Sequence, residues 1–275
     1  MEDMKTILKG NDFQFKKQFG QNFISDTNLL RSIVADAGID ETSTVVEVGP
    51  GAGTLTRAIA ERAKKVYAFE IDRTLEPVLA ESLAGLNNVE VIFRDFMKVD
   101  LAEFERELPP YTVVANIPYY ITTPLVMRFI EESRKVKSVV VMVQEEVARR
   151  FCAEAGTADY GAVTAGIALK GKAKITRKVP RTVFYPVPNV DSAVVKIEIG
   201  DGIPVKDEKL YRDTVRCAFL NRRKTLENNL VNSFRLSRED AKGLVSALGI
   251  DEKARGETLT PVQLAKLSDL LFERK

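Results

Sequence analysis

Short apolar runs alternate along the chain with longer segments in which apolar residues recur every three or four positions. The short runs predict buried strands, and the longer segments predict amphipathic helices. Strands are expected at residues 43–49, 65–72, 88–95, 112–116, 138–144 and 191–199. Helices are expected between them at 54–64, 74–86 and 124–134. Because strands separated by helices form right-handed βαβ units, the sequence predicts an α/β fold with a doubly wound, mostly parallel sheet.

The pattern changes after residues 200–204, which read GDGIP and consist mainly of turn-forming residues. Beyond them only helices are predicted, at 209–220, 223–231, 237–249 and 260–275. Two of these helices begin at good N-cap residues, Ser237 and Thr260. We therefore predict two domains, a sheet domain at 1–200 and a smaller all-helical domain at 201–275.

The composition narrows the chemistry that the chain can perform. The sequence contains no histidine, which excludes histidine-based catalytic triads and removes the usual general base. Cys152 and Cys217 lack the spacing of a metal site, so no metal is expected. The first residues lack the apolar core of a signal peptide, and no segment approaches the ~18 consecutive apolar residues of a membrane helix. We expect a cytosolic protein that acts away from membranes.

Net charge bears on the choice of partner. The 41 basic and 39 acidic residues give a net charge of +2, which argues against a uniform coat for binding nucleic acid. A local basic face is still compatible with this balance, because binding depends on where charge lies rather than on its sum.

Three successive predicted strands end in residues suited to a nucleoside. Gly49, Gly51 and Gly53 follow the first strand, where glycines let the backbone approach a ligand closely. Glu70 ends the second strand, in the place of the acid that accepts ribose hydroxyls, and Asp95 ends the third, where it could accept from an adenine amino group. Taken singly, the glycines could form only a tight turn and each acid could be a solvated carboxylate. Together they favour a ligand that contains adenosine.

The next predicted strand, at residues 112–116, ends at Asn116, which is the first residue of the sequence NIPYYITTP (116–124). The Asn116 side chain and a main-chain carbonyl offer two acceptors to an exocyclic amine, and Pro118 fixes the turn without an N–H. Tyr119 offers a ring on which a flat base can stack. A proline turn with aromatic core residues is the plainer alternative. The stretch follows a strand next to the predicted nucleoside site, and it predicts a second site there that holds an aromatic amino group.

With these motifs in place, the sequence resembles the small-subunit ribosomal RNA adenine dimethyltransferases. These S-adenosylmethionine enzymes have a Rossmann-like domain and place two methyl groups on N6 of each of two adjacent adenines near the 3′ end of that RNA. The resemblance covers almost the whole chain, and its motifs are KKQFGQNFI (16–24), EVGPGAGTLT (47–56), FEID (69–72), RDFMKVD (94–100), NIPYYITTP (116–124), MVQEEVARR (142–150), FYPVPNVDSAVV (184–195) and FLNRRKTLENNL (219–230). Related large-subunit enzymes share the earlier motifs, whereas the last two are more typical of the small-subunit group.

The resemblance implies a role for each matching residue. The target adenine would be held by Asn116, Pro118 and Tyr119, with Phe184 on its other face. The cofactor S-adenosylmethionine would be bound by Gln21, Asn22, Phe23, Gly49, Gly51, Gly53, Glu70, Ile71, Asp95, Phe96 and Asn116. Ile117 stands where the family often has leucine, and FLNRRK where it often has FNQRRK. Neither change removes a proposed polar contact.

Basic clusters are the candidate RNA contacts, and a solvated helix face is the alternative for each cluster. Arg222, Arg223 and Lys224 lie in a motif that matches the family, which favours binding. The other candidates are Arg149, Arg150, Lys16 and Lys17. The expected partner is the small ribosomal subunit or its precursor, and the protein is expected to be a monomer.

Three other functions stay open at this point. The chain could methylate adenine in large-subunit RNA, or it could act on DNA or a small molecule. It could also be a non-enzymatic binding factor built on the same fold, since fold alone does not decide function. The complete motif at Asn116–Tyr119 and the cofactor residues favour an enzyme.

Overall fold

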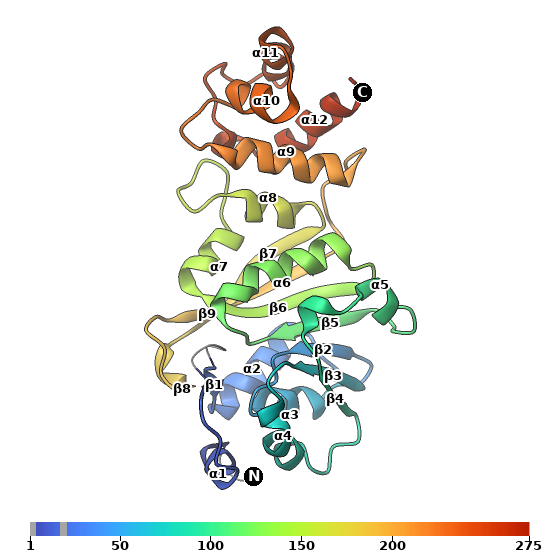
Figure 1. Cartoon of the computed structure of the whole chain (residues 1–275), viewed down its shortest axis with the longest axis vertical. Helices are drawn as coiled ribbons and strands as arrows, with labels where there is room; N and C mark the ends of the chain where they lie inside the picture. Colours follow the sequence, from blue (N-terminus) through green and yellow to red (C-terminus); the bar gives the residue numbers. More distant parts are fainter. Residues whose placement is uncertain (1–3, 17–20, 275) are drawn as a thin grey trace. The chain divides into compact units, whose positions relative to one another are not determined.

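The computed structural model describes residues 4–16 and 21–274 (Figure 1). The chain forms two compact units. The first contains Met1–Ala148 and Lys174–Ile199, and the second contains Arg149–Ala173 and Gly200–Lys275. The chain therefore passes from the first unit to the second, returns, and passes to the second again.

A seven-stranded sheet forms the centre of the first unit, in the order β4-β3-β2-β5-β6-β9-β7. The bounds of its strands are β2 (Thr44–Val48), β3 (Lys65–Glu70), β4 (Val89–Phe93), β5 (Tyr111–Ala115), β6 (Val136–Gln144), β7 (Gly171–Val179) and β9 (Ser192–Ile199). The strands β4, β3, β2, β5 and β6 pair in parallel, and β9 pairs antiparallel to β6. The predicted mostly parallel α/β fold is confirmed.

The order of the strands determines where a ligand can bind. From β2 the chain moves outward to β3 and β4, and then returns to the other side of β2 for β5 and β6. Ligands of such sheets bind at the carboxyl ends of the strands where the order reverses. In this sheet that point lies between β2 and β5, directly before the glycine loop and Asn116.

The remaining elements of the first unit surround this sheet or extend from it. A two-stranded antiparallel sheet pairs β1 with β8. The bounds are β1 (Phe23–Ile24), β8 (Phe184–Tyr185), α1 (Met4–Gly10), α2 (Thr27–Ala37), α3 (Thr54–Ala60), α4 (Glu76–Ser82), α5 (Leu101–Phe104) and α6 (Tyr119–Glu132), with 3-10 turns η2 (Arg73–Leu75), η3 (Phe96–Lys98) and η4 (Arg181–Val183).

Helix α6 begins five residues earlier than the sequence predicts. The prediction starts it at Pro124, but the helix starts at Tyr119 and continues through that proline. Proline lacks the N–H that a helix interior needs, so its presence there costs stability. The buried side chains of Leu125, Val126 and Phe129 follow it and anchor the helix on the sheet. Because the helix starts early, Tyr119 stands in its first turn.

The second unit is a bundle of helices with its own apolar core. Its helices are α8 (Ala162–Ala168), α9 (Glu208–Leu220), α10 (Leu226–Phe234), α11 (Arg238–Ala247) and α12 (Pro261–Phe272), with the 3-10 turn η5 (Gly256–Thr258), while α7 (Glu145–Phe151) crosses from the first unit. Ser237 and Thr260 cap α11 and α12 as the sequence predicts.

The second unit contains a segment that the sequence prediction assigns to the sheet domain. The sequence places residues 149–173 in the sheet domain, whereas in the structure they pack with the C-terminal helices. The Tyr160 hydroxyl donates to the Leu259 carbonyl at 2.9 Å, and the Tyr211 hydroxyl donates to the Ala165 carbonyl at 2.9 Å. These buried bonds, together with Leu169 in the same core, hold the segment in the helical unit. Among the described residues, no helix has the length and apolarity needed to span a membrane.

Candidate active site

The turn between β2 and α3 can form only because it contains glycine. Gly51 has φ +59° and Gly53 has φ +80°, in the left-handed region that side chains disfavour. A Cβ on Gly51 would lie 2.6 Å from the Phe23 ring, and one on Gly53 would lie 2.4 Å from the Ser82 hydroxyl. The first of these glycines lets the N-terminal segment close on the loop, and the second lets α4 pack beneath it.

Glu70, at the end of β3, holds the glycine loop in place. Its carboxylate accepts the backbone N–H of Gly51 at 3.1 Å and those of Ile71 and Asp72 at 2.8 Å each. Burial raises the pKa of Glu70, the three N–H groups oppose that rise, and the Asp72 charge adds to it. A carboxylate that is fixed in this way can present its remaining lone pairs to the hydroxyls of a ribose.

The N-terminal segment is fastened to the site through Asp72, which is buried. The Lys16 ammonium donates to one Asp72 oxygen at 2.7 Å, and the Gln21 amide donates to the other at 3.0 Å. Burial opposes ionisation of Asp72, but the hydrogen bonds from Lys16, Thr74 and Gln21 hold the pKa of the carboxyl below its usual value. The amide oxygen of Gln21 also accepts the Lys16 backbone N–H at 3.0 Å. Gln21 lines the pocket, whereas Lys16, a predicted RNA contact, is bound to Asp72 beside it. The predicted RNA contact Lys17 lies outside the described residues.

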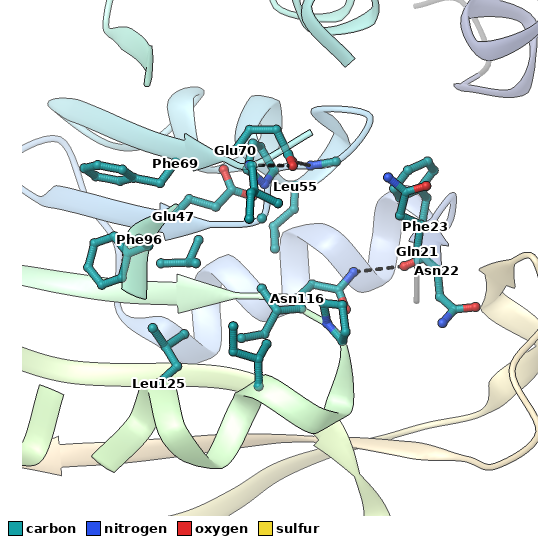
Figure 2. Close-up of a pocket in the computed structure, with 18 of the residues that line it drawn as sticks. Gln21, Asn22, Phe23, Glu47, Leu55, Phe69, Glu70, Phe96, Asn116 and Leu125 are labelled. Carbon is teal, nitrogen blue, oxygen red and sulfur yellow. Dashed lines mark hydrogen bonds between the residues drawn. The ribbon is translucent and has the colours of Figure 1, made fainter. Parts of the chain in front are cut away.

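The predicted base clamp lies at the end of β5. The Asn116 side-chain nitrogen donates to the Asn22 carbonyl at 3.2 Å (Figure 2). Because an amide group has one donor end and one acceptor end, this bond leaves the Asn116 oxygen as an acceptor for a ligand. The Tyr119 hydroxyl and the Ser192 hydroxyl share a hydrogen bond of 3.0 Å, which anchors the ring to β9.

The Pro118 carbonyl has partners that the sequence does not reveal. It accepts the Ile121 N–H at 3.1 Å and the Thr122 hydroxyl at 3.3 Å, because α6 begins directly after it. A carbonyl oxygen has two lone pairs. For this carbonyl to be the main-chain acceptor of a target amine, one of the two bonds must lengthen.

The two residues that are predicted to read the cofactor adenine, Asp95 and Phe96, follow β4. One Asp95 oxygen caps η3 by accepting the Met97 N–H at 3.0 Å, and the other lies 3.8 Å from the Lys98 ammonium. The Phe96 ring is buried and packs on Phe69, with ring centres 4.9 Å apart. Ile71 is different, since 52% of it is exposed, as an apolar surface that packs on a base requires.

One pocket joins these elements, and nearly every predicted cofactor and base residue lines it. The exception among them is Gly53, which faces α4 instead. Figure 2 shows part of this lining. Phe184 lines the pocket but is only 4% exposed, because its ring also belongs to the core around α2 and α3. A base that stacks on Phe184 must therefore use the small part of the ring that faces the pocket.

The structure adds Glu47, which the sequence prediction does not include. Glu47 lies on β2, is 1% exposed and lines the pocket. Neither of its carboxylate oxygens has a hydrogen-bond partner among the described residues. Burial raises the pKa of Glu47 to about 8; the neighbouring Thr56 hydroxyl counters the rise without forming a well-aligned bond, and the Glu70 charge adds to it. The signal in the sequence is a charged residue among the valines of the strand STVVEVG.

We expect Glu47→Gln to stabilise the protein at pH 8 more than at pH 5. With a pKa of about 8 in the fold and 4.5 when unfolded, the native state keeps a proton that the unfolded chain loses as pH rises between these values. The free energy of unfolding of the wild type therefore falls as pH rises over this range, by an amount on the order of a few kcal/mol at pH 8. Glutamine does not titrate, so the variant does not undergo this fall. Urea unfolding at both pH values measures it. Glu61→Gln, on an exposed glutamate, is the control. An identical effect of Glu47→Gln at both pH values would show that Glu47 is ionised in the native protein.

The basic candidates of the second unit differ in their surroundings. The Arg222 guanidinium donates to a Glu257 oxygen at 2.8 Å and to the Tyr160 carbonyl at 3.2 Å. Arg222 therefore joins parts of the helical bundle, whereas Arg223 and Lys224 are exposed. Arg149 lies 3.5 Å from the Asp159 carboxylate, and Arg150 is exposed at the end of α7.

Comparisons with known proteins agree with this geometry. A model of the family described as ribosomal RNA adenine dimethylase matches residues 12–272. Two proteins named ribosomal RNA small subunit methyltransferase A are among the similar sequences. That of Geobacillus thermodenitrificans is 46% identical over 98% of this chain and 94% of its own length. That of Streptococcus gordonii is 45% identical over 97% of this chain and 95% of its own length.

Two solved structures share the architecture over nearly the full chain. A dimethyladenosine transferase from Plasmodium falciparum superposes with a TM-score of 0.77 and 27% identity, covering 92% of this chain and 98% of that one. The 23S rRNA methyltransferase ErmE superposes with a TM-score of 0.70 and 28% identity, covering 91% of this chain and 99% of that one.

Proposed function

The chain belongs to the ribosomal RNA adenine dimethylase family, and we propose that it methylates two adjacent adenines near the 3′ end of small-subunit ribosomal RNA with S-adenosylmethionine. As a member of this family it is an enzyme that dimethylates adenine in small-subunit ribosomal RNA. The methyl donor, the position of the adenines and the role of each residue are the parts that we propose. The observation that carries the proposal is the oriented Asn116 amide in the same pocket as Glu70 and Asp95.

The pocket suits S-adenosylmethionine in its shape and its charge. Gly49 and Gly51 line the pocket, and because they lack side chains, Ile117 and Phe23 can pack against the glycine loop. Glu70, fixed by three backbone N–H groups, is the proposed acceptor of the ribose hydroxyls. Asp95, fixed by the Met97 N–H, is the proposed acceptor of the adenine amino group. The uncompensated carboxyl of Glu47 suits a cationic ligand, because a nearby positive charge favours the ionised form of an acid.

S-adenosylmethionine, when bound, supplies a sulfonium methyl group that a nucleophile can attack in line. The residues of the clamp prepare that nucleophile, the N6 nitrogen of adenine, whose lone pair is delocalised into the ring. By accepting a hydrogen bond from N6–H, the Asn116 oxygen favours a more pyramidal nitrogen and aims its lone pair. Tyr119, anchored by Ser192, offers its ring to the base. Such positioning can supply as much as ~7–11 kcal/mol.

The absence of histidine is compatible with this chemistry. Because methyl transfer would neutralise the sulfonium, no residue of this chain would need to act as an acid toward the leaving group. The N6 proton becomes strongly acidic only after the methyl group has arrived, so the step needs no dedicated base. The cost is that a stacked base must be drawn out of the RNA, at a few kcal/mol. Stacking on Tyr119 and on the open part of Phe184, worth ~1–3 kcal/mol per base, offsets that cost.

The choice of RNA is tested by transfer of labelled methyl groups. Purified protein is incubated with methyl-labelled S-adenosylmethionine and small ribosomal subunits, with large subunits and DNA in parallel. Label in small subunits alone supports the proposal. Because ErmE is named for 23S rRNA and shares the fold, label in large-subunit RNA alone would reassign the substrate. The expectations of a cytosolic location and of a monomer stay predictions.

We propose that Arg223 and Lys224 contact RNA phosphates. The double variant Arg223→Gln/Lys224→Gln should weaken binding to small subunits and reduce the slope of log affinity against log salt by about 2, because each phosphate contact contributes roughly one unit. Titrations at several salt concentrations measure this slope. The control is Lys253→Gln/Lys266→Gln, which removes two exposed cations of the same unit. Equal slopes for the wild type and the first variant would place the RNA elsewhere.

A further inference from the structure

The side chain of Arg128 is almost fully enclosed, with 10% of it exposed. It stands on α6 and reaches across to the turn that follows β4. One terminal nitrogen of the guanidinium donates to the Phe96 carbonyl, and the other donates to the Val99 carbonyl. Its Nε donates to a Glu132 oxygen at 3.0 Å, one helical turn away. All three nitrogens of the group are thus directed to an acceptor.

The two carbonyls belong to a single short turn. Phe96 opens η3 and Val99 follows it, so the fork of the guanidinium spans the whole turn. The same guanidinium lies over the Phe96 ring, with its carbon 5.7 Å from the ring centre. Because hydrogen bonds from a charged donor are about twice as strong as neutral ones, Arg128 fixes both the backbone of the turn and the ring inside it.

The turn that Arg128 fixes begins with a proposed adenine-reading residue. Asp95 is the N-cap of η3, and its carboxylate is held by the Met97 N–H inside the same turn. Movement of the Phe96 and Val99 carbonyls would therefore carry the Asp95 carboxylate with them. Arg128 itself sits on the helix whose first turn contains Tyr119. Arg128 thus connects α6, which contains the proposed target-base residue Tyr119, to the turn that begins at the proposed cofactor-adenine residue Asp95.

We propose that Arg128 is a positioning residue that sets the place of Asp95 and so the selectivity of the pocket for the adenine amino group. This inference rests on the proposed function, since it takes Asp95 as the acceptor of that group. Arg128 is not among the residues that line the pocket. It acts by holding the turn, and lysine could not replace it fully because an ammonium lacks the planar fork that reaches two carbonyls.

The test compares two ligands that differ in one group. The first is S-adenosylhomocysteine, and the second is the analogue in which hydrogen replaces the adenine amino group. Calorimetric titration gives the affinity of each for the wild type and for Arg128→Met, Arg128→Lys and Glu132→Gln. We expect Arg128→Met to bind S-adenosylhomocysteine roughly tenfold more weakly, as the loss of one good hydrogen bond does, and the analogue as tightly as the wild type does.

The ratio of the affinity for S-adenosylhomocysteine to the affinity for the analogue distinguishes a residue that positions Asp95 from one that only stabilises the fold. Arg128→Lys should give an intermediate ratio. Glu132→Gln should keep the wild-type ratio, because it removes only the charge of the exposed partner and leaves both carbonyl bonds. A wild-type ratio in both Arg128 variants, or an equal loss of affinity for both ligands, would overturn the inference. If Arg128→Met does not fold, the ratio for Arg128→Lys decides. A wild-type protein that binds neither ligand would instead overturn the proposed cofactor.

Discussion

Asn116→Ala is expected to slow methyl transfer by roughly 10²–10³-fold, the effect of removing one preorganised polar contact from an active site. Alanine removes the oxygen that we propose accepts from N6–H and the nitrogen that donates to the Asn22 carbonyl. The N6 nitrogen then loses the contact that orients its lone pair and favours its pyramidal geometry. Affinity for S-adenosylhomocysteine should fall far less, because the glycine loop, Glu70 and Asp95 are untouched. Single-turnover rates with small subunits and calorimetry with the cofactor product measure the two effects.

The matched control is Asn87→Ala, which removes the same side chain from an exposed turn. It should transfer methyl groups at the wild-type rate. An Asn116→Ala protein that binds the cofactor product and also transfers at the wild-type rate would mean that the clamp does not act on the nucleophile.

Glu70→Ala is expected to weaken cofactor binding strongly and to lower thermal stability. Three backbone N–H groups, on Gly51, Ile71 and Asp72, lose their acceptor together. Each buried donor left without a partner costs about 1–3 kcal/mol. The glycine loop then loses its support, and the ribose loses its proposed acceptor, so affinity for S-adenosylmethionine should fall by about 100-fold or more. Calorimetric titration and thermal unfolding measure these changes.

Glu61→Ala supplies the comparison, because Glu61 is exposed at the end of α3. It should bind the cofactor as the wild type does. Glu70→Gln refines the test, since its amide oxygen can still accept some of the three N–H groups. If Glu70→Ala bound S-adenosylmethionine with wild-type affinity, Glu70 would have no part in the cofactor site.

The sequence predicts those elements whose apolar pattern is strong. Strand β2 is entirely buried, and its run of valines stands out in the sequence. Strand β7 is missing from the prediction, and most of its residues, Lys172 and Lys174 among them, are not buried. Such an edge strand has no clear alternation of apolar and polar residues to find. The assignment of residues 149–173 to the helical unit depends on long-range contacts such as Tyr160 with Leu259, which no local pattern contains.

The sequence predicts those residues of the candidate site that lie at the ends of the strands. Parallel strands bring Gly49, Glu70, Asp95 and Asn116 to one edge of the sheet, and the resemblance added Gln21 to Phe23. The partners of these groups could not be predicted, because they come from distant segments. Asp72 holding Lys16 and Gln21 is one example, and Arg128 holding the turn after Asp95 is another.

The central claim is tested most directly by mapping the methyl groups on the RNA. Small subunits that lack the modification are incubated with the protein and S-adenosylmethionine, and the 3′-terminal fragment of the RNA is excised and sequenced by mass spectrometry. We predict N6,N6-dimethyladenosine at two neighbouring positions of that fragment, and none after incubation with Asn116→Ala. An unmethylated fragment, from a protein that demonstrably binds the cofactor, would contradict the account.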